Sequence, residues 1–98
     1  MALRGIQKRH LRGLAHHLSP VVHLGKAGLT DGIVAATDQA LTDHELIKVR
    51  LPQVDKTQRK ALAESLEKST NSDQAGLTGR MLVLYRRHPD EPKIKLPK

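Results

Sequence analysis

A glycine-rich loop stands between a short β-branched segment and the start of a helix, and this order constrains the fold more than any other feature. Val21–Leu24 is typical of a strand, and the loop Gly25–Gly28, with Lys26 inside it, follows directly. Glycine has no Cβ, so another backbone can approach such a loop closely. Thr30 is a predicted N-cap, and the free N–H groups of the helix it starts favour a phosphate. An ordinary strand-to-helix turn has the same pattern, so the loop alone does not decide the function.

The first segment is predicted to be a basic amphipathic helix over residues 3–17, because leucines recur there at helical spacing. Arg4, Lys8 and Arg12 recur every four residues on the opposite side, and no carboxylate precedes Asp31. Like charges four residues apart repel by a few tenths of a kcal/mol per pair. A bound polyanion would relieve this repulsion, so the row favours a nucleic-acid contact over a face that only confers solubility. His10 is expected to be a partly buried packing residue of this helix.

The middle of the chain alternates strands and helices. Leu46–Leu51 predicts a strand with Ile47, Val49 and Leu51 buried and with Lys48 and Arg50 on an outer basic face. The pair Asp55 and Gln58 resembles a capping box, which would start a third helix ending near residue 69. The second helix is predicted over residues 31–43.

The end of the chain predicts a hairpin and an arm. Residues 74–78 form a weak predicted strand, since Gly76 stands where a β-branched residue is expected. Met81–Tyr85 is the most apolar strand and should be central in the sheet. His88–Lys98 holds three of the five prolines and predicts an extended, basic C-terminal tail after a domain of residues 1–87.

The resulting order, α-β-α-β-α-β-β, predicts an α/β fold with a mixed four-stranded sheet packed with helices. Each of the first two β-α-β passages fits a right-handed crossover with parallel pairing. The last two strands fit an antiparallel hairpin.

Composition favours a nucleic-acid partner and excludes one mode of binding it. The formal net charge is +7, and a sequence pI near 10.2 is the usual electrostatic footprint of a nucleic-acid binder. Tyr85 is the single aromatic residue, which excludes a surface built on aromatic base stacking. The absence of cysteine fits a reducing compartment, and we expect a cytoplasmic protein without a membrane partner. A basic, acid-free N-terminus also occurs in mitochondrial transit peptides, but Ser19 is its one serine.

Catalysis and metal binding are not expected. The serines carry no hydrolase motif, and the glycine loop lacks the length and the Lys-Ser/Thr ending of a Walker A motif. His16 and His17 are adjacent, so they should point apart on a helix, and no His-x3-His pair occurs. We therefore expect a non-enzyme with no cofactor and no metal.

Three motifs resemble a known family: Gly25–Gly32, His44–Val49 and Gly79–Arg86. In this order and spacing they resemble the YhbY-like family, bacterial single-domain members of the CRM (chloroplast RNA splicing and ribosome maturation) class. The resemblance covers roughly residues 3–87. It implies a fold similar to the C-terminal domain of translation initiation factor 3, and an RNA-binding domain associated in bacteria with precursors of the large ribosomal subunit.

The sequence thus predicts a monomeric, non-catalytic protein that binds precursor ribosomal RNA of the large subunit during ribosome assembly. The alternative is a protein-interaction module that docks on ribosomal proteins or assembly factors, which an exposed aliphatic patch would favour. The residues predicted to bind RNA come from the first helix, the loop and the end of the last strand: Arg4, Lys8, Arg9, Arg12, Gly25, Lys26, Ala27, Gly28 and Arg86.

Overall fold

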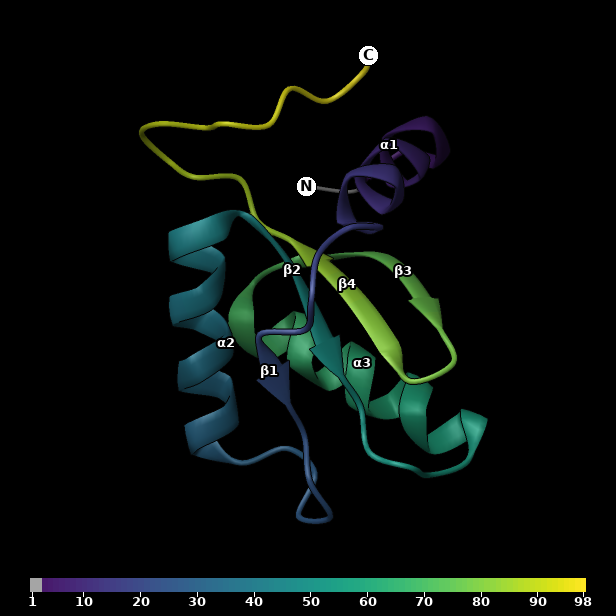
Figure 1. The fold of residues 1–98 in the computed structure, drawn as a ribbon. Helices are drawn as coiled ribbons and strands as arrows, with labels where there is room; N and C mark the ends of the chain where they lie inside the picture. The colour runs from purple at the N-terminus through teal and green to yellow at the C-terminus, as the bar shows by residue number, and fades with distance from the viewer. Residues whose placement is uncertain (1–2) are drawn as a thin grey trace.

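A computed structural model describes residues 3–98, and they form three helices and one four-stranded sheet (Figure 1). The predicted α/β class and element order are confirmed. In chain order the elements are α1 (Gly5–Ala15), β1 (Val22–His23), α2 (Asp31–His44), β2 (Leu46–Arg50), α3 (Lys56–Thr70), β3 (Asp73–Thr78) and β4 (Met81–Tyr85).

The strands lie in the order β1-β2-β4-β3. β1 pairs with β2 in parallel, and β4 pairs antiparallel with both β2 and β3. The mixed sheet and the final hairpin are therefore confirmed. Direct parallel pairing in the second β-α-β passage is wrong, because β4 lies between β2 and β3. The composition of β4 explains its place: Leu82 through Tyr85 are all buried, so this strand is covered on both faces.

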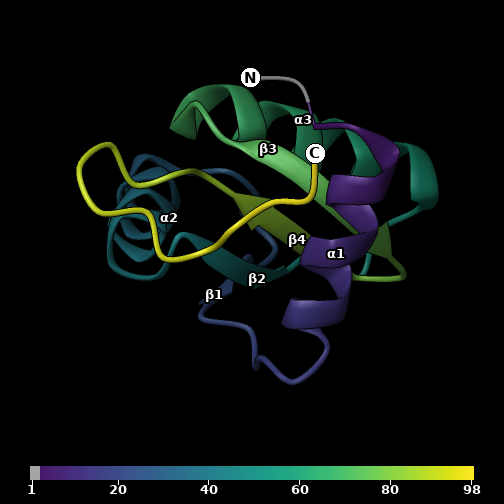
Figure 2. The ribbon, with the colours of Figure 1, turned by 90° about the horizontal axis from the view of Figure 1, so that it is seen from above.

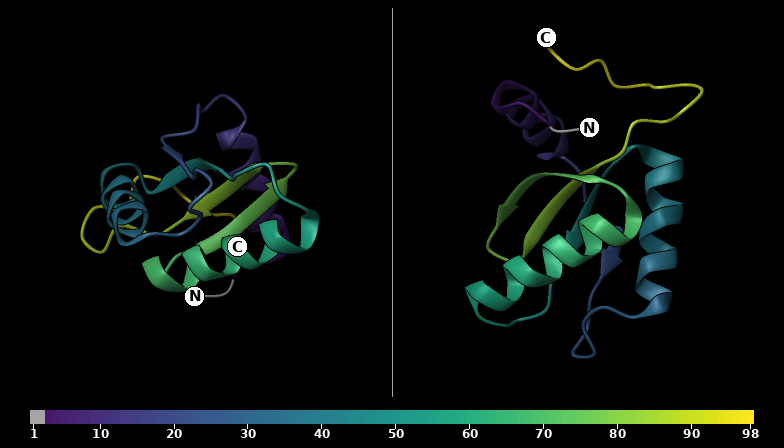
Figure 3. Two further views of the ribbon diagram at one scale, coloured as in Figure 1. Left: turned by 90° about the horizontal axis from the view of Figure 1, so that it is seen from below. Right: turned by 180° about the vertical axis from the view of Figure 1, so that it is seen from behind.

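Helices cover both faces of the sheet, α2 and α3 on one and α1 on the other (Figures 2 and 3). The larger core lies under α2 and α3, and it is aliphatic: Val22, Leu24, Leu41, Ile47, Val49, Leu51, Ala63, Leu66, Leu82 and Leu84. The smaller core lies under α1, on what we call the α1 face: Leu11, Ala15, Leu46, Ala75, Val83 and Tyr85. The predicted burial of Ile47, Val49 and Leu51 is thus confirmed, and the basic face of β2 is the α1 face.

Local sequence signals fix the helix starts. The Thr30 hydroxyl accepts a hydrogen bond from the Ile33 N–H at 3.2 Å, and the Asp55 carboxylate accepts one from the Gln58 N–H at 2.8 Å. Both predicted N-caps are therefore confirmed. At the end of α3, Asn71 adopts the left-handed conformation with φ of 52°, which closes the helix as asparagine often does. No helix within residues 3–98 is long and apolar enough to cross a membrane.

β3 continues through Gly76, which makes a specific contact with α1. The side chain of Arg12 lies across this glycine, and its Nη1 donates a hydrogen bond to the Ala75 carbonyl at 2.9 Å. A Cβ built on Gly76 would stand 2.7 Å from Arg12 Cδ, inside the distance that real contacts allow. The pairing with β4 shifts register between Gln74 and Gly76. The glycine therefore provides the space in which α1 docks on the sheet.

Replacing Gly76 with valine is expected to destabilise the fold by about 1–3 kcal/mol, because the new side chain displaces Arg12 and overpacks the contact. Chemical denaturation measures the change. Arg12→Ala removes the clash, so the double variant should lose less than the sum of the two single variants. Additive losses would show that Arg12 and Gly76 do not share a contact.

The C-terminal tail has no helix or strand, as predicted, but it packs on the domain. Ile94 and Leu96 are half-buried against the smaller core. Glu45, 2% exposed, accepts hydrogen bonds from the backbone N–H groups of His88 and Lys93. Its positive φ of 63° turns the chain sharply from α2 into β2. The buried Glu45 carboxylate thus fixes the tail at His88 and at Lys93. Beyond its bend the tail passes over the end of the sheet near α1 (Figure 1).

Candidate nucleic-acid interface

The glycine loop forms a tight turn at one end of the molecule (Figure 1). The Gly28 N–H donates to the Gly25 carbonyl at 2.9 Å, and Gly25, Lys26 and Ala27 are exposed. Gly28 has φ of +69°, a conformation that side chains rarely adopt, and an added Cβ would lie 3.5 Å from Leu62 of α3. At Gly25 an added Cβ meets nothing within 4 Å. Gly28 is thus required by the turn, whereas Gly25 leaves open space in front of the backbone.

The loop leaves the sheet beside Arg50, the last residue of β2. His23 pairs with Arg50, and the Leu24 N–H donates to the Arg50 carbonyl at 2.9 Å. Both His23 and Arg50 are exposed. Arg80 lies at the same end of the sheet, where its Nε donates a hydrogen bond to the carbonyl of Leu51, the residue after Arg50. The distance is 2.9 Å. The end of the sheet that carries the loop is therefore basic.

The first helix lies over the other end of the sheet. Its buried residues, Leu11 and Ala15, share a core with Leu46 and Tyr85, which pair at the far end of the β2–β4 ladder from Arg50. Four residues of strand separate the two ends, about 13 Å. Two views of the ribbon show the loop below the sheet and α1 above it (Figures 1 and 3). The basic row of α1 therefore does not directly adjoin the loop.

The α1 row is also less uniform than its sequence indicates. Lys8 lines a depression of about 520 Å³ together with carboxylates from α3 and β3, namely Glu64, Glu67 and Asp73. Burial raises the pKa of the Asp73 carboxyl and nearby Glu67 raises it further, whereas Lys8 lowers it. Carboxylates from α3 and β3 thus lie near Lys8 in the folded protein, although the first segment itself contains none.

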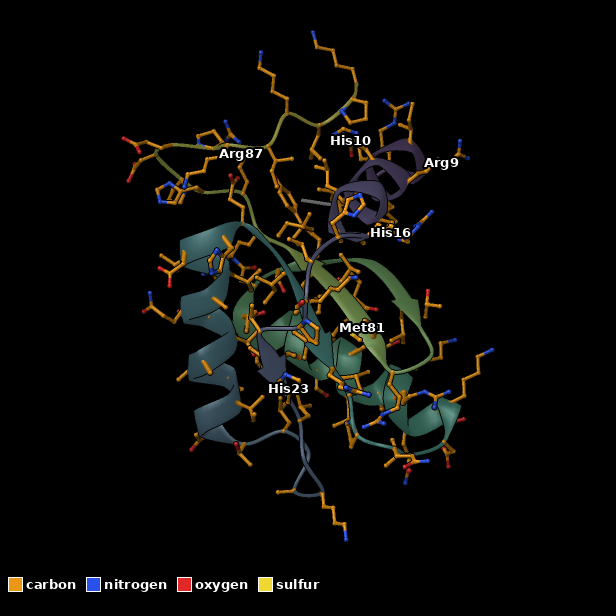
Figure 4. The ribbon with its side chains drawn as sticks, viewed as in Figure 1. Arg9, His10, His16, His23, Met81 and Arg87 are labelled. Carbon is orange, nitrogen blue, oxygen red and sulfur yellow. The ribbon has the colours of Figure 1, made fainter. Side chains whose placement is uncertain are left out.

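Two of the predicted α1 cations remain turned to solvent. Arg4 and Arg9 are exposed, and Figure 4 shows Arg9 pointing away from the sheet. The guanidinium of Arg12 is hydrogen-bonded to the Ala75 carbonyl, as described above. His10 is exposed rather than partly buried, so its predicted packing role is wrong. It stands on the outer side of the helix, whereas Leu11 fills the core.

A strip of uncovered sheet connects the loop to α1. Lys48 and Arg50 alternate along β2 on the α1 face, and Lys48 Nζ lies 3.4 Å from the carbonyl of His16 at the end of α1. His23 lies on this strip, between the loop and His16 (Figure 4). Neither residues 3–30 nor β2 and β4 contain a carboxylate. We call this strip, together with the exposed cations of the loop and of α1 at its two ends, the cationic track, and its members are Lys26, Arg50, Lys48, Arg9 and Arg4.

Sequence reasoning placed Lys48 and Arg50 on a basic strand face but did not connect them to the loop. The missing information is the register of β1 against β2, which sets His23 beside Arg50. The sequence already predicts that the first two strands pair in parallel. That pairing places the loop after the first strand close to the end of the second strand, where Arg50 lies.

Arg86 is engaged within the fold. Its guanidinium donates to the Asp38 carboxylate at 2.6 Å, to the Thr70 and Asp38 carbonyls, and to the Thr42 hydroxyl. These contacts join α2 to the end of α3. The outer surface of α2 has the opposite charge to the track, since this helix carries three aspartates and no lysine or arginine.

Within residues 3–98 no group of three His, Asp or Glu side chains could hold a metal ion. His16 and His17 do not point apart as expected, because α1 ends before them. Their rings meet edge to face with centroids 5.3 Å apart.

A family model described as the CRS1 / YhbY (CRM) domain matches residues 3–86. A Haemophilus influenzae relative named "RNA-binding protein" is 45% identical over 94% of this chain and 92% of its own length. The Bacillus subtilis protein named "Probable RNA-binding protein YqeI" is 38% identical over 97% of this chain and 99% of its own length.

A solved structure has the same fold. The solution structure of a Staphylococcus aureus hypothetical protein, described as a candidate RNA-binding protein, superposes with a TM-score of 0.86 at 39% identity. It covers 97% of this chain, and this chain covers 99% of it. The match of the family model across nearly the whole chain and the full-length relatives show that the chain belongs to the CRS1/YhbY (CRM) domain family.

Proposed function

We propose that this protein binds RNA, without catalysis, along the cationic track. The observation that carries the proposal is a row of cations on segments that contain no carboxylate, which ends at an exposed glycine turn. Arginine and lysine at this density attract a polyanion, and backbone contacts supply most of nucleic-acid affinity. Membership of the CRM family and the RNA-binding names of the relatives support the same conclusion.

The glycine loop would hold one phosphate and the track would hold the ones that follow. Lys26 and the loop amides contact the first phosphate, and Gly25 lets the RNA backbone come close because no side chain stands in front of it. Asp31, in the first turn of α2, places this phosphate toward Lys26 instead of on the helix axis. Arg50 and Lys48 then carry the RNA across the sheet toward Arg9 and Arg4. The contacts are to charge and shape, since the chain lacks an aromatic stacking surface.

The RNA we propose is precursor ribosomal RNA of the large subunit, bound by a monomer in the bacterial cytoplasm during ribosome assembly. The support is the family resemblance. Crosslinking in cells, followed by sequencing of the attached RNA, tests it. Enrichment of large-subunit precursor over transfer RNA is expected, and equal recovery of both would contradict the assignment while leaving RNA binding intact.

Affinity for RNA is expected to fall with salt, because each neutralised phosphate releases counterions. The slope of log K against log salt should be roughly −0.7 to −0.9 per phosphate contacted. Lys26→Ala should reduce its magnitude by about one unit. Lys68→Ala, an exposed lysine of α3 outside the track, is the matched control and should leave the slope unchanged. An affinity insensitive to salt would refute phosphate binding by the track.

A further inference from the structure

A second surface lies beside the track, and it is apolar. A groove of about 540 Å³ opens between the end of α1, the link to β1, the end of α2 and the C-terminal tail. Its lining residues are mostly aliphatic: Leu14, Leu18, Ser19, Val21, His44, Leu46, Ile47 and Ile94. RNA phosphates have no partner in such a groove, so the proposed RNA contact does not account for it.

The groove gathers most of the exposed large aliphatic side chains of the described residues. Leu14, Leu18 and Val21 are 44%, 40% and 50% exposed, and Ile6, at 51%, is the one large hydrophobic residue this exposed elsewhere in residues 3–98. Single exposed aliphatic residues are ordinary on a protein surface. Three that line one hollow, over a floor formed by buried Leu46 and Ile47, are typical of an interaction site.

Charged residues of both signs stand near the groove. Lys93 and Lys95 flank Ile94, one of the lining residues, and both lysines are exposed. Asp43 and Glu45 lie at the end of α2, and with Glu91 they line a separate depression that includes Lys93. The net charge of the whole chain is +7, so charge complementarity favours an apolar partner with acidic flanks over a second copy of this basic chain.

We propose that the groove docks an amphipathic helix of a partner protein, with leucine-like anchors in the groove and aspartate or glutamate at its flanks. An apolar helix face laid in a hydrophobic groove is a recurrent mode of recognition. The flanking carboxylates pair with Lys93 and Lys95. The domain would thus hold RNA on its track and an acidic protein segment beside it.

The test uses a synthetic amphipathic peptide of about 15 residues, long enough to form a helix. It carries leucines four residues apart and aspartates at both ends, and a second version has lysines in place of the aspartates. Titration into the 15N-labelled full chain is expected to shift the amide resonances around Leu14, Leu18 and Val21. The lysine version is expected to bind at least about tenfold more weakly. Equal affinity of the two peptides, or shifts elsewhere on the molecule, would overturn the proposal.

Variants of exposed residues separate the groove from the fold and from RNA binding. Leu18→Asn should weaken binding of the acidic peptide by about tenfold or more, because the contact between Leu18 and a leucine of the peptide is lost. Ile6→Asn removes an equally exposed aliphatic residue outside the groove and should leave peptide binding unchanged. RNA affinity should be the same for both variants. The proposal fails if Leu18→Asn weakens RNA binding in place of peptide binding, or if it abolishes a dimer seen by sedimentation of the wild-type chain.

Discussion

Replacing Gly25 with aspartate is expected to weaken RNA binding by about tenfold or more while leaving thermal unfolding nearly unchanged. An added Cβ at this position meets nothing within 4 Å, and the residue does not share the positive φ of Gly28. The fold should therefore tolerate the side chain. A carboxylate in the loop would stand near the proposed phosphate, and like charges a few ångströms apart at a protein surface repel by about 1–4 kcal/mol. Filter binding at fixed salt measures the loss.

The matched control places the same charge on the acidic helix. Ala36 is exposed on α2, which contains no lysine or arginine. Ala36→Asp should change RNA affinity by less than about twofold, because the added charge lies outside the track. If both variants lost affinity equally, net charge and not the loop would determine binding. If neither lost affinity, the loop would lie outside the interface.

Replacing Arg86 with lysine is expected to reduce the free energy of unfolding by about 2 kcal/mol or more. Lysine cannot reproduce the planar set of donors that reaches Thr42, Thr70 and Asp38 together. Most of the loss should come from the backbone carbonyls and the Thr42 hydroxyl, which lose a charged donor. The Asp38 carboxylate is 58% exposed, so its ion pair adds little. Urea denaturation measures the loss as a lower midpoint with an unchanged m-value.

The neighbouring arginine provides the control for this variant. Arg87 is exposed, and Figure 4 shows it beside the tail. Arg87→Lys should alter stability by less than about 0.5 kcal/mol, as most surface substitutions do. Under conditions in which Arg86→Lys is folded, its RNA affinity should equal that of the wild type. A selective loss of RNA affinity without a loss of stability would restore the contact role predicted for Arg86 from the sequence.

The fold could be predicted from the sequence because its signals are local. The N-caps at Thr30 and Asp55, the alternation of β2 and the apolar run of β4 each determine an element from a few adjacent residues. The α/β class and the central place of β4 follow from these elements. The misplaced β2–β3 pairing shows the limit, since hydrophobic pattern alone does not state which strands are neighbours.

The site could be predicted only in part, because its members depend on tertiary contacts. Arg12 and Arg86 have the same appearance in the sequence as Arg4 and Arg9, yet both are engaged in the fold. The acids that face Lys8 come from elements far along the chain. Strand propensity alone predicts a weak position at Gly76, whereas the role of this glycine depends on the side chain of Arg12 from α1. Charge spacing thus identified a basic surface but not which cations remain free.

The central claim is that one RNA backbone contacts the glycine loop and α1 through the sheet between them, and a 15N-detected titration with RNA tests it most directly. The prediction is that amide resonances of residues 25–28, of Arg50 and of Arg4 and Arg9 shift together along one saturation curve, while those of α2 beyond its first turn stay in place. Shifts confined to α1, with the loop and Arg50 unmoved up to saturation, would contradict the account.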